Sequence, residues 1–396
     1  KILKKKDLFF LSNYEKDRYK FLEKDQVIYT NIVKKIKKEI TLQKVITKKI
    51  SNDFFENVNI YYLPFENYKN SGKKPVGFFF KIKGKLYLIT GDAFFYEIKI
   101  NKQITNKLEL VKIDSNINFN INSDIITNKG QSSIKGVMVD SLEENIYIST
   151  TNLKRNDCYN LKIVKANLIE NFFKVQNFFE FKECVKKKKD KRFSILQGAG
   201  GNMIDYNNKI LFSTGDYANY SSAQNLNDPF GKVLLIDKIK KETEIISAGH
   251  RNIQGMYLDR TNNTIIYSEM GPKGGDEINI NKKPFNGIVK NYGWPISSYG
   301  DHYDNKFLDE APLYNSHKKF GFIEPIKFWN PSIAPTKIQK IYTNEGKENI
   351  YVLSTLGYLD QIKEGDQSLH FLYFNKDYSM IRKIKQEPIY ERVRDF

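Results

Sequence analysis

Short apolar runs, each preceded by a turn and ended by small polar residues, recur along the chain. The five clearest runs are Gly84–Asp92, Asn145–Thr150, Asn208–Asp216, Asn263–Glu269 and Asn349–Thr355. Their alternating pattern and their β-branched and aromatic content predict strands. Successive runs start roughly 55 to 86 residues apart, which is typical of sheets arranged as blades around an axis. The longest interval, after Asn263, is expected to contain a further blade whose strand signal is weak.

The first forty residues follow a different pattern. They are rich in charge, with helices predicted at Tyr14–Phe21 and Ile32–Ile40 and a short apolar stretch at Leu8–Leu11. From Thr41 the pattern becomes β-type, at Leu42–Ile46 and again at Val58–Leu63. We therefore predict a basic, partly helical extension over residues 1–40 and an all-β propeller over residues 41–396. The absence of 3.6-residue apolar stripes excludes a helical array.

The charge balance is strongly basic, with a formal net charge of +18 and a sequence pI of about 9.4. Such a balance can indicate binding to nucleic acid or to an anionic membrane. The lysines are spread through the sequence, however, and the densest run, Lys186–Arg192, lies where a loop between strands is expected. No nucleic-acid-binding motif accompanies it. We interpret the charge as lysine-rich solvated faces, with a polyanion-binding surface as the weakest of the functional alternatives.

The sequence contains no apolar stretch of about 18 residues, so no membrane-spanning helix is predicted. It begins Lys1-Ile2-Leu3 rather than with methionine. This start fits either removal of an upstream signal or anchor, or missing terminal residues.

The only two cysteines, Cys158 and Cys184, flank a predicted hairpin. Its strands are Tyr159–Leu168 and Val175–Lys182, and its turn lies around Glu170-Asn171. In a simple hairpin with this turn the two cysteines face each other, which favours a disulfide over two buried thiols. A disulfide would indicate an oxidising compartment.

Polar residues and glycines are most concentrated between Ala248 and Pro295. This stretch opens with the hydrogen-bonding side chains of His250, Arg251, Asn252 and Gln254. A predicted strand follows, and then the glycine-rich stretch Glu269–Glu277. Tight turns of this type present backbone carbonyls, and hard cations such as calcium favour carbonyl and carboxylate oxygens.

Three linked motifs in this region resemble the PQQ-dependent soluble glucose dehydrogenase and aldose sugar dehydrogenase family. They are Gly249-His250-Arg251-Asn252-Ile253-Gln254-Gly255, Glu269–Asn279 and Asn291-Tyr292-Gly293-Trp294-Pro295. A weaker resemblance extends over 77–396 and includes Gly200–Met203 through Gly215-Asp216, Gly231–Asp237, Asn330–Pro335 and Arg392–Asp395. It implies a six-bladed β-propeller with the quinone and calcium at the mouth of its channel. The family continues past the last motif, so the last blade either lacks residues or is closed by N-terminal strands.

The resemblance also implies an activity: a hydride passes from C1 of an aldose to PQQ while a histidine takes the hydroxyl proton. The residues that it assigns to the cofactor are Arg251, Asn252, Gln254, Arg392 and Arg394. The residues that it assigns to calcium are Gly271 and Pro272 for the cofactor's calcium and Glu277 and Tyr292 for a second, structural one.

The sequence departs from the family at the catalytic positions. The position of the base is Gly198, and no histidine precedes His250. Gln197 is a substitute that could orient a hydroxyl, but an amide is not a base. Met270 stands where the family has a hydrogen-bonding side chain, and the late lysine of the family falls near Leu356-Gly357 and is absent. Removing a positioned base typically costs on the order of 10²–10⁴ in rate.

Each candidate also has a structural interpretation. Arg251 and Asn252 can bridge the backbones of neighbouring blades, because polar residues at strand ends satisfy carbonyls there. Gly271-Pro272 can be a plain turn, and Asp276 and Glu277 can belong to a surface loop instead of a calcium site.

The locations of two aromatic residues and one histidine are also predicted. Tyr292 and Trp294 are expected to pack in the core between blades, and His302 is expected in a loop rather than at the channel mouth.

Two functional hypotheses follow, besides polyanion binding. One is a sugar dehydrogenase of this family with a substitute base. The other is a non-catalytic propeller that serves as a binding or assembly module, with a carbohydrate or a protein as its partner. Both are expected in the periplasm, outside the cell or at its surface, with a missing N-terminal segment as a tether.

Overall fold

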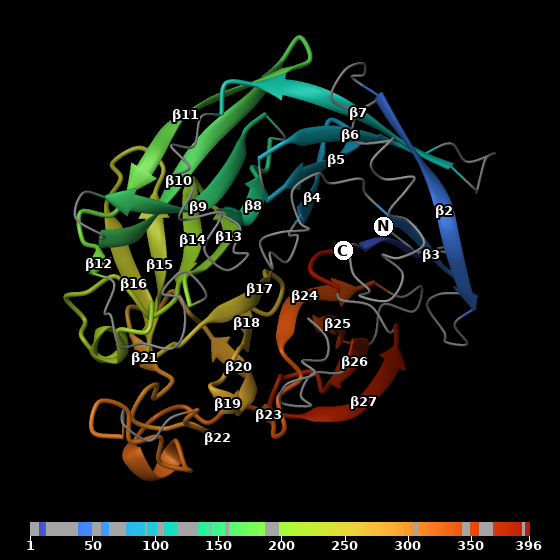
Figure 1. Cartoon of the computed structure of the whole chain (residues 1–396). Helices are drawn as coiled ribbons and strands as arrows, with labels where there is room; N and C mark the ends of the chain where they lie inside the picture. The colour runs from blue at the N-terminus through green and yellow to red at the C-terminus, as the bar shows by residue number, and fades with distance from the viewer. Residues whose placement is uncertain are drawn as a thin grey trace.

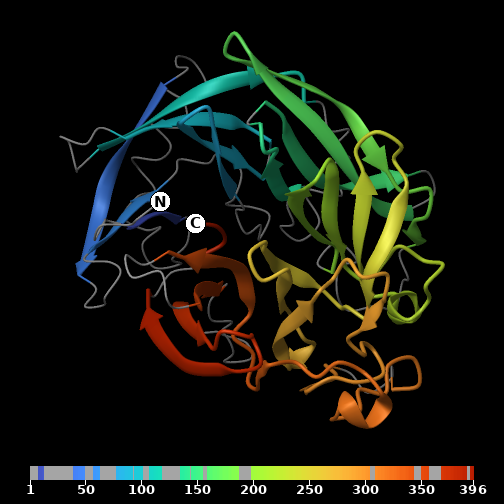
Figure 2. The ribbon, with the colours of Figure 1, turned by 180° about the vertical axis from the view of Figure 1, so that it is seen from behind.

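The computed structural model shows an almost entirely β structure whose sheets surround a central axis (Figures 1 and 2). It describes residues 8–12, 39–49, 57–62, 77–91, 93–100, 107–117, 134–142, 144–154, 158–186, 198–303, 308–342, 349–355, 367–389 and 393–396. Among these residues the only helices are two 3₁₀ turns, η1 (Tyr220–Ala223) and η3 (Lys318–Phe320).

Five sets of four antiparallel strands succeed one another along the chain and around the axis. The first two sets are β4 (Gly77–Ile82), β5 (Lys85–Thr90), β6 (Phe95–Lys99) and β7 (Lys107–Ser115), then β8 (Ile134–Val139), β9 (Ile146–Lys154), β10 (Cys158–Ile169) and β11 (Phe172–Glu180). The third set is β13 (Gly200–Tyr206), β14 (Lys209–Thr214), β15 (Lys232–Asp237) and β16 (Thr243–Ala248). The last two are β17 (Ile253–Asp259), β18 (Thr264–Glu269), β20 (Asp276–Lys282) and β23 (Lys327–Trp329), then β24 (Pro335–Ile341), β25 (Asn349–Thr355), β26 (Ser368–Phe374) and β27 (Ile381–Pro388).

Three strands precede these sets. β1 (Leu8–Ser12) pairs in parallel with β3 (Asn57–Tyr62), and β2 (Glu39–Lys49) pairs with both β3 and β7. In both views they lie between the first and the last four-stranded set. The β-propeller fold is therefore confirmed, and the count of six blades stays a prediction.

Each of the five sequence repeats coincides with all or most of the second strand of a set, namely β5, β9, β14, β18 and β25. The small polar residue near the end of two of them bonds to the innermost strand of the next set. Ser149 Oγ donates to the carbonyl of Gly201, and Ser268 Oγ donates to the carbonyl of Thr336, at 2.8 Å in the second case. The repeat therefore encodes contacts between sheets as well as strands.

Glycine in the innermost strands allows the neighbouring sheets to approach. A Cβ at Gly136 would lie 2.3 Å from the carbonyl oxygen of Gly201, and a Cβ at Gly255 would lie 2.3 Å from that of Thr336. The apolar core fills the space between adjacent sheets, for example where Phe80, Tyr87 and Phe95 meet Ile146 and Val164.

The prediction of a further blade after Asn263 is wrong for the residues that the structure describes. Most of this interval forms a long excursion with short strands: β19 (Lys273–Gly274) pairs with β22 (Gly300–Asp301), and β21 (Lys290–Asn291) joins β16. Among the residues described in this interval, loops account for the extra length and no further four-stranded set is found.

The N-terminal predictions are tested only in part. Leu8–Leu11 lies in β1, and Glu39 and Ile40, predicted as the end of a helix, begin β2. The other residues of the two predicted helices lie outside the described residues. The predicted strand Leu42–Ile46 is confirmed, and so is Val58–Leu63 as far as Tyr62, since Leu63 lies outside the described residues.

The predicted hairpin and disulfide are confirmed. Strands β10 and β11 turn at Glu170 and Asn171, both of which have positive φ. Their register shifts once, between Ile163 and Val164, and the chain then continues to a short strand, β12 (Val185–Lys186), which pairs with β10. The Cys158–Cys184 bond ties the open end of the hairpin, with its Cα atoms 5.4 Å apart.

Candidate functional site

The turn His250–Asn252 between β16 and β17 is organised by one carboxylate, that of Glu269 at the end of β18. This carboxylate accepts hydrogen bonds from the backbone N–H groups of Arg251 and Asn252. It also lies 3.0 Å from His250 Nδ1, while His250 Nε2 lies 2.8 Å from Ser247 Oγ. Because His250 is fully buried and bonded at both ring nitrogens, its role is structural.

Three of the predicted cofactor residues form one hydrogen-bonded chain. Gln254 Nε2 donates to Asn252 Oδ1 at 2.8 Å, and Asn252 Oδ1 also accepts from the N–H of Gly200 at 3.3 Å. Gln254 Oε1 accepts from Arg394 Nη1 at 3.1 Å. The fold thus brings together residues 140 positions apart in the sequence.

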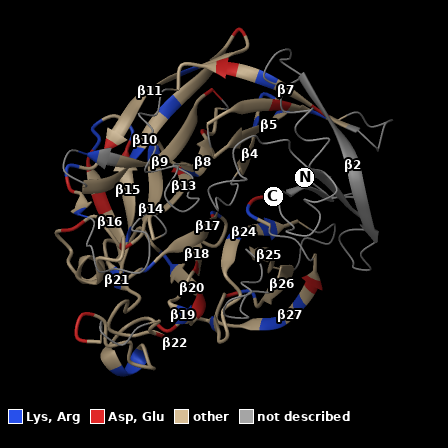
Figure 3. Ribbon diagram, viewed as in Figure 1, with Lys and Arg blue, Asp and Glu red and all other residues tan. Residues whose placement is uncertain are grey.

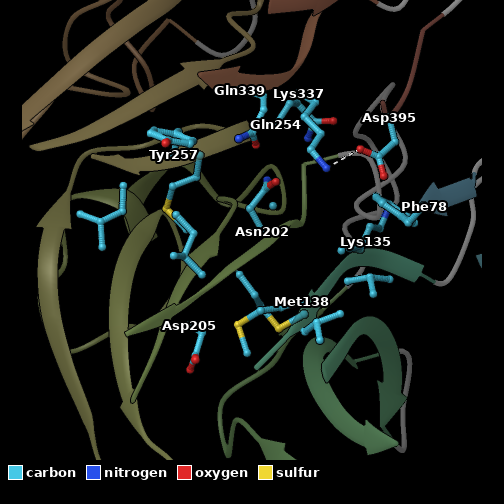
Figure 4. Close-up of a pocket in the computed structure, with 18 of the residues that line it drawn as sticks. Phe78, Lys135, Met138, Asn202, Asp205, Gln254, Tyr257, Lys337, Gln339 and Asp395 are labelled. Atoms are coloured by element: carbon cyan, nitrogen blue, oxygen red, sulfur yellow. Dashed lines mark ion pairs between the residues drawn. The ribbon is translucent and has the colours of Figure 1, made fainter. Parts of the chain in front are cut away.

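Gln254 and Arg394 line a cavity of about 310 Å³ on the axis of the propeller (Figure 4). The cavity is enclosed by the innermost strands β4, β8, β13, β17 and β24 and by the segment 393–396. Amides reach it from Asn202, Gln254 and Gln339, and cations from Lys135, Lys337 and Arg394. Its volume lies at the low end of the range for small-molecule sites.

The cavity is electropositive. Its two acidic lining residues are already paired: Asp395 lies 2.5 Å from Lys337 Nζ, and Asp205 pairs with Lys238, which is outside the lining. Burial, together with a smaller effect of the nearby Arg394 guanidinium, lowers the pKa of Lys135 to about 7. Burial also lowers the pKa of Arg394, to about 10. Two cations that share one cavity favour an anionic ligand.

Neither Lys135 nor Lys337 was predicted as a site residue, because neither belongs to a motif. The available signal is positional: each stands on the first strand of a four-stranded set, β8 or β24, and such strands face the axis.

Gly198 lies just before β13, beside Asp216. A Cβ at Gly198 would lie 3.1 Å from Asp216 Oδ1. The other oxygen of this buried carboxylate accepts a hydrogen bond from Trp294 Nε1 at 2.8 Å. Gly198 therefore places no side chain in the position assigned to the base, and the predicted substitute Gln197 lies outside the described residues.

No histidine is among the described residues that line the cavity. His302 Nε2 lies 2.6 Å from the carbonyl oxygen of Ala311 in a loop, as predicted. His370 packs edge-on against Trp329 in the last sets of strands. The described lining of the cavity therefore offers no imidazole base.

The carbonyls predicted to hold the cofactor's calcium already accept hydrogen bonds. Arg251 Nη1 donates to the carbonyl of Gly271 at 2.6 Å and to that of Met270 at 3.0 Å. The hydroxyl of Tyr303 donates to the carbonyl of Pro272 at 3.0 Å. The guanidinium of Arg251 also lies over the ring of Trp294, 5.4 Å from its centroid. Arg251 is therefore engaged with this loop and does not line the cavity.

The oxygens predicted to hold the second calcium contact a histidine. His317 Nδ1 lies 2.9 Å from the carbonyl oxygen of Tyr292, and His317 Nε2 lies 3.2 Å from Glu277 Oε1. Burial lowers the pKa of His317, but the Glu277 carboxylate and the Tyr292 carbonyl outweigh this effect, so the pKa lies above its usual value. Among the described residues, no three His, Cys, Asp or Glu side chains gather as a metal site. The residues present do not fit calcium at either place.

Asp276 and Glu277 do not form a surface loop, because both are buried. Asp276 Oδ1 accepts from the N–H of Gly271 at 2.9 Å, and Oδ2 accepts from the N–H groups of Ile333 and Ala334 at 2.8 and 2.7 Å. Asp276 therefore fastens the glycine-rich turn to the loop before β24.

The remaining predictions have mixed outcomes. Tyr292 and Trp294 are buried in the core, as predicted. Arg392 and the Leu356-Gly357 position of the missing lysine lie outside the described residues.

Comparison with known proteins places this geometry in a known family. A family model described as Glucose / Sorbosone dehydrogenase matches residues 100–395. The aldose sugar dehydrogenase YliI of Escherichia coli is 31% identical over 149 residues, which cover 34% of this chain and 38% of that protein. The uncharacterized protein slr1608 of Synechocystis is 35% identical over 97 residues, 24% of this chain and 21% of that protein. The alignments thus span well under two thirds of either relative.

Solved structures share the fold over most of their length. A crystal structure of a glucose dehydrogenase matches with a TM-score of 0.61 and 17% identity, covering 82% of this chain and 90% of that one. The soluble aldose sugar dehydrogenase of Escherichia coli in its apo-form matches with a TM-score of 0.57, 19% identity and coverages of 82% and 90%. The PQQ-bound aldose sugar dehydrogenase of Streptomyces coelicolor matches with a TM-score of 0.53, 15% identity and coverages of 90% and 88%.

Proposed function

Because the chain belongs to the glucose/sorbosone dehydrogenase family, we propose that its axial cavity binds a carboxylate-bearing ligand of the chemical class of PQQ. The single observation that supports this proposal is the excess of cations in the lining, where Lys135 and Arg394 share one cavity. Negative charge on a ligand would relieve their mutual repulsion.

Different side chains of the cavity would make different contacts with the ligand. The forked guanidinium of Arg394 suits a carboxylate, and its hydrogen bond to Gln254 fixes its orientation. Lys135, which Figure 4 shows among the lining side chains, would add a point charge from β8. A bound quinone would supply the hydride acceptor for sugar oxidation.

Binding without efficient turnover is the function that these residues support best. An aldose loses the proton of its C1 hydroxyl as hydride leaves, and Gly198 offers no base for that proton. The expected loss is on the order of 10²–10⁴ in rate relative to an enzyme with a positioned base. The protein would then serve as a binding or assembly module, with a carbohydrate or a protein as a further partner.

Aldose oxidation is the second candidate function. It is favoured by family membership and by the carboxylate of Asp216, which lies where a side chain from position 198 would point. A carboxylate is a weak base at neutral pH but an acceptable one in a desolvated site.

The proposed location is an oxidising compartment, either the periplasm or the outside of the cell or its surface. The Cys158–Cys184 disulfide supports this proposal, because such bonds persist where thiols are not kept reduced. Among the described residues no helix has the length and apolarity needed to cross a membrane. Basic and acidic residues are interspersed over the described strands (Figure 3), so nucleic acid is not the proposed partner.

Titration of the purified chain with PQQ, followed by calorimetry and absorbance, tests the proposal. We expect micromolar or tighter binding and at least a tenfold loss in the Arg394→Ala variant. The exposed Lys240→Ala variant is the control and should bind as the parent chain does. Absence of binding to the folded parent chain would overturn the proposal. A parallel assay with aldoses and a dye acceptor separates the two candidate functions.

A further inference from the structure

Two groups of oxygen atoms attract cations in this propeller, and each already contacts a basic side chain of the chain itself. The first group is formed by the carbonyls of Met270 and Gly271, which Arg251 bonds. The second is formed by the Glu277 carboxylate and the Tyr292 carbonyl, which His317 contacts. The first group contains Gly271, which family resemblance assigns to the cofactor's calcium together with Pro272, whose carbonyl accepts from Tyr303 instead. The second group is the pair that the resemblance assigns to the structural calcium.

At the first place the guanidinium fills the space in front of the carbonyls. One nitrogen, Nη1, bonds both oxygens, at 2.6 Å to Gly271 and at 3.0 Å to Met270. Calcium needs six to eight oxygens at about 2.3–2.6 Å. A calcium ion on the Gly271 carbonyl would therefore have to displace the guanidinium, which would also repel it.

At the second place the imidazole lies between two acceptors. Its Nδ1 faces a carbonyl oxygen, which only accepts, and its Nε2 faces a carboxylate oxygen. The ring is 1% exposed, and the ring of Tyr299 stacks on it with centroids 5.3 Å apart. The imidazole therefore occupies the space in front of both the Tyr292 carbonyl and the Glu277 carboxylate.

The backbone at Gly293 passes close to the imidazole of His317 at the second predicted calcium place. Gly293, with φ of +88°, lies between Tyr292 and Trp294, and a Cβ there would be 3.0 Å from His317 Nδ1. The glycine of the Asn-Tyr-Gly-Trp-Pro motif therefore leaves room for the imidazole beside the Tyr292 carbonyl.

We propose that Arg251 and His317 are internal substitutes for calcium, so that this propeller folds and keeps its channel loops without a metal ion. The proposal does not depend on ligand binding in the axial cavity, and neither basic residue lines that cavity.

Thermal unfolding of the full chain in EDTA and in millimolar calcium tests the proposal. We expect the same midpoint in both solutions, whereas a protein that holds calcium tightly would gain several degrees, about 5 °C. Terbium emission sensitised by Trp294 and the neighbouring tyrosines reports metal binding directly, and we expect none that calcium displaces. A midpoint that rises with calcium, or emission that calcium quenches, would overturn the proposal.

Removal of either cation should create a response to calcium. His317→Ala removes the side chain that fills the space between Glu277 and the Tyr292 carbonyl, so its midpoint in EDTA should fall and calcium should partly restore it. Arg251→Ala frees the Met270 and Gly271 carbonyls and should behave in the same way. The controls are His302→Ala and Arg260→Ala, which remove the same side-chain types elsewhere and should stay insensitive to calcium.

Insensitivity of both cation-removing variants to calcium would show that these places are not cation sites, and would also overturn the proposal. If a variant does not fold in EDTA, refolding in calcium provides the same comparison. The measurements on the parent chain decide the question of metal independence in every case.

Discussion

The carboxylate of Asp395 accepts a hydrogen bond from the backbone N–H of Phe79, 316 residues earlier in the chain, at 2.8 Å. The same carboxylate pairs with Lys337 of β24. Two residues earlier, Val393 donates its N–H to the carbonyl of Thr355 at the end of β25. The segment 393–396 therefore connects the last four-stranded set to the first, beside the axial cavity.

This connection predicts that Asp395→Ala lowers the free energy of unfolding by about 1–3 kcal/mol, because it leaves the partly buried N–H of Phe79 and the ammonium of Lys337 without their acceptor. Chemical denaturation measures the change. Asp377→Ala is the matched control: its exposed carboxylate lies 3.9 Å from Lys282, so its loss should lower the free energy of unfolding much less. Equal effects of the two substitutions would contradict the role given to Asp395.

Asp276→Asn should also destabilise the fold, by about 1–3 kcal/mol. The carboxylate accepts from three backbone N–H groups and from the hydroxyl of Ser332, so an amide would turn its own N–H₂ group toward donors. Burial outweighs these hydrogen bonds and raises the pKa of Asp276 to about 6. Denaturation at pH 7.5 measures the effect, and a variant as stable as the parent chain would show that the hydrogen bonds are unimportant.

Binding of an anionic ligand in the cavity should weaken above pH 7. The pKa of Lys135 is about 7, so this cation loses its proton between pH 6 and pH 8, whereas Arg394 keeps its charge. The affinity for PQQ, measured by calorimetry, should fall by at most about tenfold per pH unit above 7. In Lys135→Met the pH dependence should disappear while binding through Arg394 remains. An unchanged pH profile in that variant would exclude Lys135 as the titrating group.

The same lysine affects stability without ligand in the opposite sense. Its pKa falls on folding from 10.5 to about 7, so the unfolded chain binds this proton more tightly than the folded chain. The contribution of Lys135 to the free energy of unfolding is therefore unfavourable below pH 7 and improves as the pH rises from 7 toward 10. Denaturation of the parent chain and of Lys135→Met over this range isolates the contribution.

Gly198→His should fold and should increase aldose oxidation. The new Cβ would lie 3.1 Å from Asp216 Oδ1, so that neighbour must move by a few tenths of an ångström, and the carboxylate would then orient the imidazole. If PQQ binds, the rate should rise by about 10²–10⁴. Gly198→Gln is the matched control because it crowds the same site without supplying a base. Equal rates in the two variants would refute the assignment of position 198.

Much of the fold could be predicted from the sequence because the signals are local. Strands β5, β9, β14, β18 and β25 follow from a repeated turn and alternating apolar residues, and the disulfide follows from a hairpin register within one set of strands. The prediction of a further blade failed because it used the spacing of repeats. Loops such as the one from β20 to β23 change that spacing without adding a sheet.

The candidate site could be predicted only where motifs carry it. Gln254 and Arg394 were expected from their motifs, and the structure joins them by a hydrogen bond. Lys135 could not be predicted, because lysines on strands are common. Only the arrangement of the sheets around the axis shows that this lysine faces the cavity. The partners of Arg251 and His317 were likewise hidden, since the motifs give residue types and not their contacts.

The sequence by itself determined the β-type strands, the disulfide, the family motifs and the absence of a histidine before position 250, since each depends on residues close together or on identity alone. The tertiary structure decided that Lys135 and Arg394 share a cavity and that Arg251 and His317 contact the oxygens expected to bind calcium. These relationships join residues from different sheets and loops. Their distances are set by how the sheets pack around the axis, which no local pattern specifies.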